Sequence, residues 1–406
     1  MKSYTEIHTS DQTLKAHRSL ANELLSEKAS AVMYCTALVL FTLSRVISYS
    51  YLAEWPIMSK MPDALLLLSM VCVVYKLILF DRYSNVRGLL IYGLIVIAGI
   101  TYIASGSWLV FVLSLFVVGA ADTHPLKMCS TAFAWIALLT AIVMTLSLIG
   151  AIDSKTSTTS SILSSIFGVG IRNSFGFAHV NYLGMLSISA YICRLIINNA
   201  RFTPMETLSW VLCAIVLFFV VNTKTASCLI LVGIIIQIII RGKSKRVIFG
   251  SFFCISCFAA IAALYLAFNF NNANGLFDFL NRFLTGRLAF AHNFLESYPI
   301  TAFGQHLFLV STIDAAELGI RSQVLDNAFV HVLLHFGWLA FLGIMVSFLG
   351  LILLASRNGK VGVALSVSLL FIAGISETWL ISMPGIIVLS QLLPMRDEIK
   401  QKSQNQ

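Results

Sequence analysis

About a dozen long apolar segments occupy most of this 406-residue chain, and they constrain its fold more than any other feature. They run from Ala31 to Met395, and the chain is 58% hydrophobic but only 11% charged. A helix needs about 20 apolar residues to cross the hydrocarbon core of a bilayer, where it satisfies its own backbone hydrogen bonds. The sequence therefore predicts an all-α fold, a polytopic membrane helical bundle that forms one integral domain over residues 1–406.

About 12 transmembrane helices are expected. They lie at 31–52, 63–80, 89–104, 106–120, 128–150, 181–198, 207–223, 226–240, 248–268, 328–354, 361–376 and 379–394. The polar segments are a cytoplasmic N-terminal segment (1–30), an outer loop (151–180), a long outer loop (269–327) and a cytoplasmic tail (395–406). Residues 1–30 lack the apolar run of a cleavable signal peptide, so we expect none.

The basic residues predict the orientation of the bundle. Of the 27 Lys and Arg residues, 17 fall on the side of the two ends and 7 on the other side. Cytoplasmic loops carry the excess of positive charge, so both termini are expected in the cytoplasm. The net charge of +9 then reflects anchoring beside anionic membrane lipid, and no nucleic-acid partner is expected. The eight Cys lie in apolar segments without metal-ligand spacing, which predicts packing roles.

Several cations nevertheless lie on the expected outer face, within short polar strings. Arg172, His179 and Asn181 belong to the string RNSFGFAHVN, and Lys224 lies in a tight turn between two apolar segments. A polar loop with a helix cap would explain the first string. Lys224 could simply be a polar residue in the turn that separates two apolar segments. Both strings also suit contact with an anionic substrate at the membrane surface.

The long outer loop contains an amphipathic pattern over 277–299, expected to form a helix lying on the membrane or capping the bundle. Arg287 falls on its apolar face, whereas His292 falls on the polar face. No acid lies one turn from Arg287, so its partner must come from elsewhere in the fold or from a ligand. This prediction assumes a helix that continues through Gly286; a break there would let Arg287 face water.

Further candidates follow at the outer ends of the last spans. Arg321, Asp326 and Asn327 close the long loop, and Glu377 ends a span; ionisable residues at a membrane edge are functional candidates. The sequence has no Asp-x-Asp pair, P-loop or HExxH motif. We therefore expect metal-independent chemistry without a cofactor, in which arginines neutralise a phosphate leaving group.

Four of these strings together resemble Wzy-type oligosaccharide repeat-unit polymerases, members of the superfamily that includes the O-antigen ligases. RNSFGFAHVN resembles the pattern Arg-x-Ser-x-Gly-Phe-x-His-Pro-Asn, with Val180 in place of Pro. Thr223-Lys224 lies where Ser-Arg is common. The segment from Gly286-Arg287 through Tyr298-Pro299 to Phe303-Gly304 is similar to a third patch, and Leu325-Asp326-Asn327 with Gly337 to a fourth. The resemblance covers most of residues 170–340.

The resemblance implies a GT-C-like membrane glycosyltransferase in the bacterial cytoplasmic (inner) membrane. Its substrates would be undecaprenyl-pyrophosphate-linked oligosaccharides, joined into capsular polysaccharide, exopolysaccharide or O-antigen. A flippase and a chain-length regulator are implied as partners. We expect Arg172, Lys224, Arg287 and, more weakly, Arg321 to grip pyrophosphate, with Asn181 and Asn327 also binding substrate. The base would be one of His179, His292, Asp326 and Glu377, with His179 slightly favoured.

Two other functions fit the same residues. A ligase would transfer a finished glycan to a different acceptor and would need the same cations. A transporter or flippase would also have about a dozen spans, although its functional charges should lie at mid-membrane. Arg45, Lys76 and Arg194 are the few charges within or near expected spans.

Overall fold

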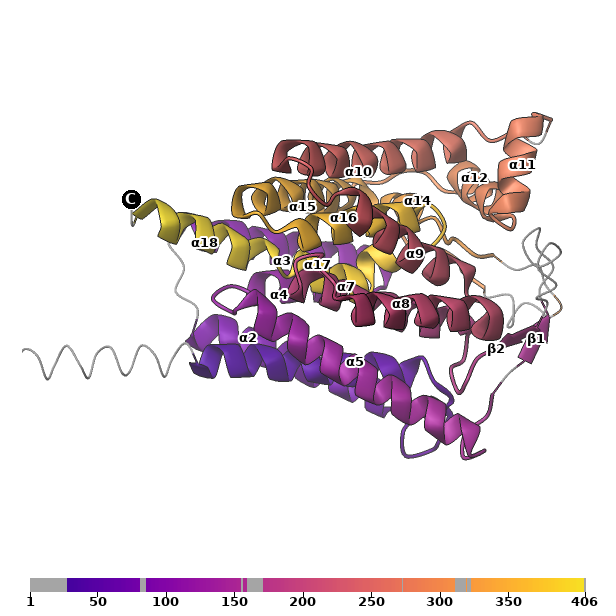
Figure 1. Cartoon of the computed structure of the whole chain (residues 1–406), viewed down its shortest axis with the longest axis horizontal. Helices are drawn as coiled ribbons and strands as arrows, with labels where there is room; N and C mark the ends of the chain where they lie inside the picture. Colours follow the sequence, from indigo (N-terminus) through magenta and orange to yellow (C-terminus); the bar gives the residue numbers. More distant parts are fainter. Residues whose placement is uncertain are drawn as a thin grey trace, which may run out of the picture.

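The computed structural model describes residues 28–80, 85–154, 156–158, 171–271, 273–310, 319 and 323–404. These residues form a bundle of helices, which confirms the predicted fold class at this level (Figure 1). Seven helices are long and apolar enough to cross a membrane: Lys28–Ser48, α2 (Met61–Leu79), α5 (Pro125–Leu148), α7 (Val180–Ile197), Pro204–Val221, α10 (Lys245–Phe268) and Ala328–Asn358. A span count of 12 and a GT-C-like arrangement stay predictions.

Shorter elements complete the described chain. Four further apolar stretches are Ile91–Ser105 within α3 (Asn85–Ser105), α4 (Leu109–Gly119), α9 (Lys224–Ile239) and α16 (Val361–Gly374). The helix Pro204–Val221 comprises α8 (Pro204–Val216) and the π-turn η2 (Leu217–Val221). The remaining elements are η1 (Tyr51–Glu54), β1 (Thr156–Thr158), β2 (Ile171–Asn173), α11 (Gly275–Phe283), α12 (Arg287–Ser297), η4 (Trp379–Ile381), α17 (Met383–Leu389) and α18 (Leu392–Gln404).

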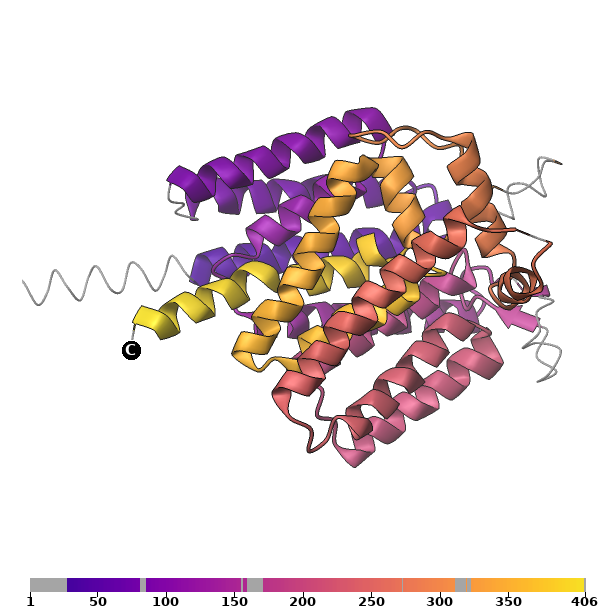
Figure 2. The ribbon, with the colours of Figure 1, turned by 90° about the horizontal axis from the view of Figure 1, so that it is seen from above.

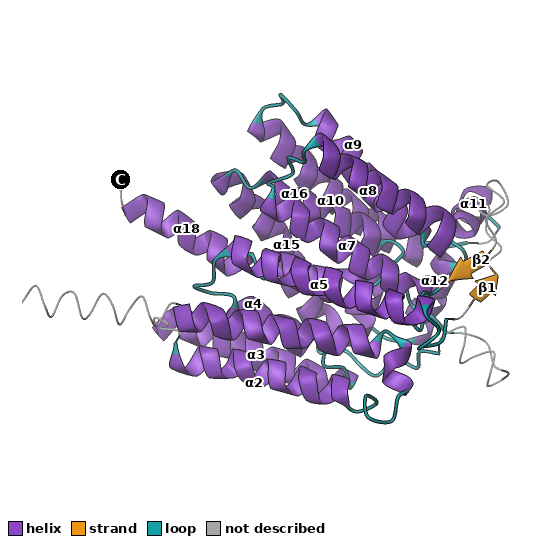
Figure 3. Cartoon of the chain, turned by 60° about the horizontal axis from the view of Figure 1, so that its bottom comes forward, coloured by secondary structure: helices purple, strands orange, loops and turns teal. Residues whose placement is uncertain are grey.

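The two ends of the bundle differ in structure. α11, α12 and the short β1–β2 hairpin lie together at one end, which we call the loop end (Figures 1 and 3). α18 and the start of the first described helix lie at the opposite end (Figures 1 and 2). This places both ends of the described chain on one side, as the charge distribution predicted for the termini.

Two apolar clusters fix these elements. The larger one fills the bundle around α7 and α16, both of which are buried along most of their length. The smaller one joins Leu288, Ala291 and Phe294 of α12 to Phe270 beyond α10 and to Val330. Its members recur on one face of α12, so burying that face holds the helix across the loop end of the bundle. This packing sets the position at which α12 begins.

A sharp bend divides the helix Ala328–Asn358 into α14 (Ala328–His331), the π-turn η3 (Val332–Phe336) and α15 (Gly337–Asn358) (Figure 2). Gly337 has φ +86°, and a Cβ added to it would clash with the backbone of Ala302 and Gly304. Gly304, at φ +85°, packs in turn against the backbone of His335 and Phe336. A side chain on either glycine would separate the two segments. The segments that contain Gly304 and Gly337 are therefore packed closely against each other at these glycines.

Candidate functional site

A cavity of about 330 Å³ opens at the loop end of the bundle. Its polar lining includes Arg172, Asn181, Lys224, Arg287 and Glu377. Its apolar lining comes from α9, α16 and the segment between α11 and α12. The lining therefore combines cations with apolar side chains, which suits an anionic group attached to an apolar chain.

The predicted continuous helix over 277–299 is wrong. Thr285 at φ +56° and Gly286 at φ +85° separate α11 from α12, and the left-handed Gly286 immediately precedes the first residue of α12. α11 leaves Leu276, Phe279 and Phe283 exposed, as a helix lying on a membrane would. α12 instead caps the bundle. The expected capping role thus applies to α12, and contact of α11 with the membrane stays a prediction.

Arg287 does not face water after the break. Its Nε lies 3.0 Å from Asp326 Oδ2, and one terminal nitrogen lies 2.7 Å from Glu377 Oε1. The same nitrogen donates to the backbone carbonyl of Ser376. The side chains of Arg287 and Glu377 are only 18% and 6% exposed. The prediction that its partner comes from elsewhere is thus confirmed: the partners lie 39 and 90 residues away in sequence.

One guanidinium therefore faces two carboxylates in a region with little water. Burial raises the pKa of Glu377, and the negative charge of Asp326 raises it further, while Arg287 opposes both effects. Burial likewise raises the pKa of Asp326 against the pull of Arg287. Thr225 also donates to Glu377 Oε1 at 3.2 Å. A carboxylate held this way is a stronger proton acceptor than an exposed one.

Arg172 lines the same cavity and forms no ion pair with any acid among the described residues. It lies on β2, opposite Ser157 of β1 in the antiparallel hairpin. Its Nε is buried, and no described residue accepts a hydrogen bond from it. Burial lowers the pKa of Arg172, and the nearby positive charge of Arg287 lowers it further. An anion in the cavity would satisfy this buried donor and relieve the repulsion.

Lys224 opens α9, directly after a buried turn. Asn222 is left-handed at φ +61° and buried, so the chain reverses between η2 and α9. Gly184 lies directly against Thr223, which lets α7 and the start of α9 approach closely. Lys224 is close enough to Arg172 for their charges to repel. The backbone N–H groups at the start of a helix add positive potential at the same place.

The two candidate histidines lie outside the cavity lining. Nδ1 of His179 accepts from the backbone N–H of Asn181 at 3.1 Å and so caps α7. Burial and the charges of Arg172 and Arg287 lower its pKa, which favours the neutral ring. Because Nδ1 accepts a hydrogen bond, the neutral ring carries its proton on Nε2. Nδ1 of His292 lies 2.9 Å from the carbonyl of Ala267 and, as the donor, ties α12 to α10. These contacts give both rings a structural role.

Of the remaining candidates, Asn327 and Asp326 also lie outside the cavity lining. Asn327 is buried, and its side chain accepts from the N–H groups of Phe329 and Val330, which caps α14. Asp326 reaches the cavity only through Arg287. Arg321 lies outside the described residues. The substrate-binding roles of Asn327 and Arg321 stay predictions.

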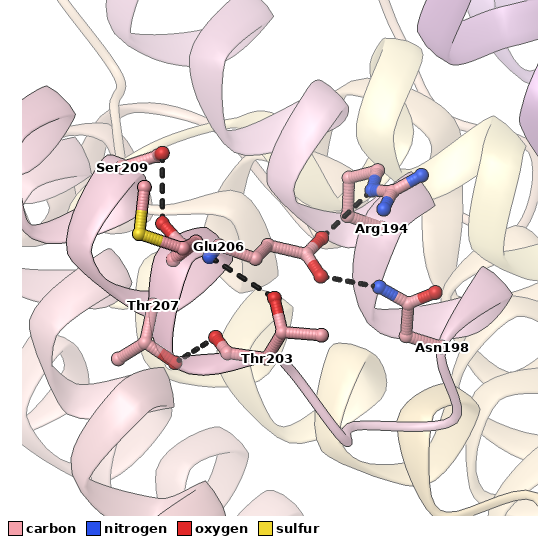
Figure 4. Close-up of polar contacts among 7 residues, drawn as sticks. Arg194, Asn198, Thr203, Glu206, Thr207 and Ser209 are labelled. Carbon is pink, nitrogen blue, oxygen red and sulfur yellow. Dashed lines mark hydrogen bonds and ion pairs between the residues drawn. The ribbon is translucent and has the colours of Figure 1, made fainter.

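The charges within the spans are partnered differently. Arg194 Nε lies 2.8 Å from Glu206 Oε1, and Asn198 donates to Glu206 Oε2 at 2.6 Å (Figure 4). Lys76 is fully buried and donates to the carbonyl of Ala121 at 2.8 Å. Arg45 forms no ion pair with any acid of the described chain, and its buried Nε has no acceptor there. Two of the three charges are therefore used within the fold.

Comparisons with protein-family models, curated proteins and solved structures find no match. In the described part of the chain, no three His, Cys, Asp or Glu side chains come together to hold a metal ion. Metal-independent chemistry stays a prediction. The site is therefore judged on its own geometry, in which a buried two-acid cluster adjoins a cationic and apolar cavity.

Proposed function

We propose that this protein is a membrane glycosyltransferase that polymerises oligosaccharide units carried on undecaprenyl pyrophosphate. One observation carries the proposal: Arg172, Lys224 and Arg287 line a single cavity whose lining also includes Glu377 and apolar side chains. A lipid pyrophosphate needs this combination at the membrane surface. Cations bind its phosphates, and an apolar wall receives the first part of its lipid.

In the proposed reaction, Arg172 and Lys224 bind the pyrophosphate of the donor. A hydroxyl of the acceptor sugar attacks C1 of the donor sugar, and the bond from C1 to the phosphate oxygen breaks. The electron pair of that bond leaves with undecaprenyl pyrophosphate, whose charge the cations stabilise. Glu377 takes the proton of the attacking hydroxyl, because it is the one candidate base in the cavity lining.

The geometry changes the part proposed for Arg287. Both of its carboxylate partners are in place, so it is not a cation waiting for phosphate. We assign it to holding Glu377 at the cavity and balancing its charge, with Arg172 as the main phosphate contact. Charge-assisted hydrogen bonds fix such side chains more firmly than neutral ones do.

The proposal places the loop end of the bundle outside the cytoplasmic membrane of a bacterium, with both termini in the cytoplasm. A flippase would deliver the units, and a chain-length regulator would act on the product. The polymer would be capsular polysaccharide, exopolysaccharide or O-antigen.

A strain that lacks the protein provides the test. We expect single lipid-linked units to accumulate on the outer face and the wild-type gene to restore a ladder of long glycans on a gel. Free long polymer in the deletion strain would instead indicate a ligase. Units trapped on the inner face would indicate a flippase, and either result would contradict a polymerase.

A further inference from the structure

The loop end contains a second cavity, of about 310 Å³, in the N-terminal half of the bundle. Arg45, from the last turn of the helix Lys28–Ser48, lines it together with Tyr49, Asp63 and Trp108. The wall also includes Ser107 and Ser382. The cavity thus offers a cation, a carboxylate, hydroxyl groups and aromatic rings at the end of the bundle where the first cavity opens.

The described residues satisfy Arg45 only in part. Ser44 accepts from it at 3.3 Å, Tyr49 is hydrogen-bonded to it, and its guanidinium lies 5.8 Å from the centre of the Phe41 ring. Its Nε is buried without an acceptor in the described chain, and no described carboxylate lies within ion-pair distance. A buried donor of this kind destabilises the fold unless a ligand satisfies it.

Direct contacts link the residues around the two cavities. Tyr49, which lines the second cavity, stacks on Tyr182 with ring centres 4.3 Å apart. Tyr182 follows Asn181, which lines the first cavity. The backbone N–H of Ala178 donates to the carbonyl of Tyr49 at 2.9 Å, so the end of the first helix is joined to the RNSFGFAHVN string. Glu377 and Ser382 line one cavity each and are five residues apart in sequence.

We propose that the second cavity binds the phosphate headgroup of the acceptor lipid, with Arg45 as its main contact and the aromatic rings beside the first sugar. The inference rests on the proposed function, because a polymerase must hold two lipid-linked substrates at one membrane surface. Two neighbouring cavities, each lined by an arginine that forms no ion pair with a described acid, meet that requirement. The stacked rings of Tyr49 and Tyr182 then lie between the two headgroups.

The first experiment counts bound lipids without requiring turnover. Purified protein is incubated with undecaprenyl pyrophosphate, and native mass spectrometry measures how many copies it retains. We expect two copies on the wild type and one each on Arg45→Gln and Arg172→Gln. Arg45→Lys should retain two. Lys60→Gln, which removes an exposed charge outside the lining of both cavities, should also retain two and serves as the matched control.

Two results would overturn the inference. One is an Arg45→Gln protein that still retains two copies. The other is phosphatidylglycerol displacing the second copy at equal concentration, which would make Arg45 a contact for bulk anionic lipid. This count of bound lipids needs no reaction, so it tests the second cavity even if the wild type makes no polymer. A wild type that makes no polymer would contradict only the proposed function.

The second experiment separates the two substrates kinetically. A lipid-linked unit with a non-cleavable phosphonate in place of its sugar–phosphate bond can accept but cannot donate. With the donor saturating, we expect Arg45→Gln to raise the acceptor KM roughly 10–100-fold, as expected for losing a charge-assisted contact. The donor KM should stay within about twofold of wild type. A rise in the donor KM alone would contradict the assignment.

Discussion

The Arg194 and Arg287 clusters lie at opposite ends of the bundle. Both contain arginine–carboxylate ion pairs, but they differ in how completely their charges are matched. Arg194 has one carboxylate partner, Glu206, whose second oxygen is taken by Asn198 (Figure 4). Arg287 has two carboxylates and shares a cavity with two further cations. The first cluster is complete within the chain. The second leaves Arg172 with a buried, unused donor. A charge matched inside the fold indicates structure, whereas an unmatched charge beside a cavity indicates a ligand.

The largest effect is expected from breaking the Arg287 cluster. Arg287→Ala leaves the buried Glu377 and the partly buried Asp326 without their cation, which should cost about 3–5 kcal/mol of stability and abolish polymer formation. Thermal unfolding in detergent and a glycan gel would measure the two effects. The triple variant Arg287→Met, Asp326→Asn, Glu377→Gln should recover much of the stability but no activity. A fully stable Arg287→Ala protein would contradict the importance of these ion pairs.

Removing the unmatched cation should separate activity from stability. Arg172→Gln breaks no ion pair between described residues, so its melting temperature should match that of wild type. Its rate of polymer formation should fall about 100- to 1,000-fold, as for the loss of one preorganised donor to a leaving group. Polymerisation assays in membranes at matched protein levels would measure this. An unchanged rate would remove Arg172 from the site.

The two-acid cluster should also give the activity an unusual pH dependence. Burial and Asp326 raise the pKa of Glu377, so a reaction that needs its carboxylate should fail at a higher pH than for an exposed glutamate. Asp326→Asn removes the repulsion and should move this acid limb to lower pH. A limb unchanged in Asp326→Asn would argue against Glu377 as the base.

The same shift has a consequence for stability. Between the ordinary pKa of a glutamate and the raised one, the folded protein holds a proton that the unfolded chain has lost. Stability should therefore fall as pH rises through that window. Glu377→Gln should reduce this dependence, which thermal unfolding at several pH values would detect.

The smallest effect is expected at the matched pair. Arg194→Gln leaves Glu206 with its Asn198 contact and partial exposure to water, so the cost should be roughly 1–2 kcal/mol. The polymer ladder should keep its length once protein levels are equalised. A shortened ladder at equal levels would mean that the comparison between the two clusters fails.

Much of the site could be proposed from the sequence, but the roles within it could not. Arg172, Asn181, Lys224, Arg287 and Glu377 were all candidates, and all line one cavity. The sequence slightly favours His179 as the base because it lies in the densest motif, and His292 comes next because it falls on the polar face of the expected loop helix. Both instead bond to nearby backbone, a contact that spacing along the chain does not reveal. Arg45 was noted only as a charge near a span end.

The sequence by itself determined that apolar helices form the molecule, because the length and polarity of each segment decide whether it can be helical in lipid. It also determined which end of the bundle carries the polar loops. Only the tertiary structure decided which charges meet. Arg287 joins Asp326 and Glu377 because the helix break at Gly286 lets α12 begin at Arg287 and pack its apolar face onto α10 and α14. Ion pairing depends on distances of a few ångströms between segments far apart in the chain, and hydropathy does not encode such distances.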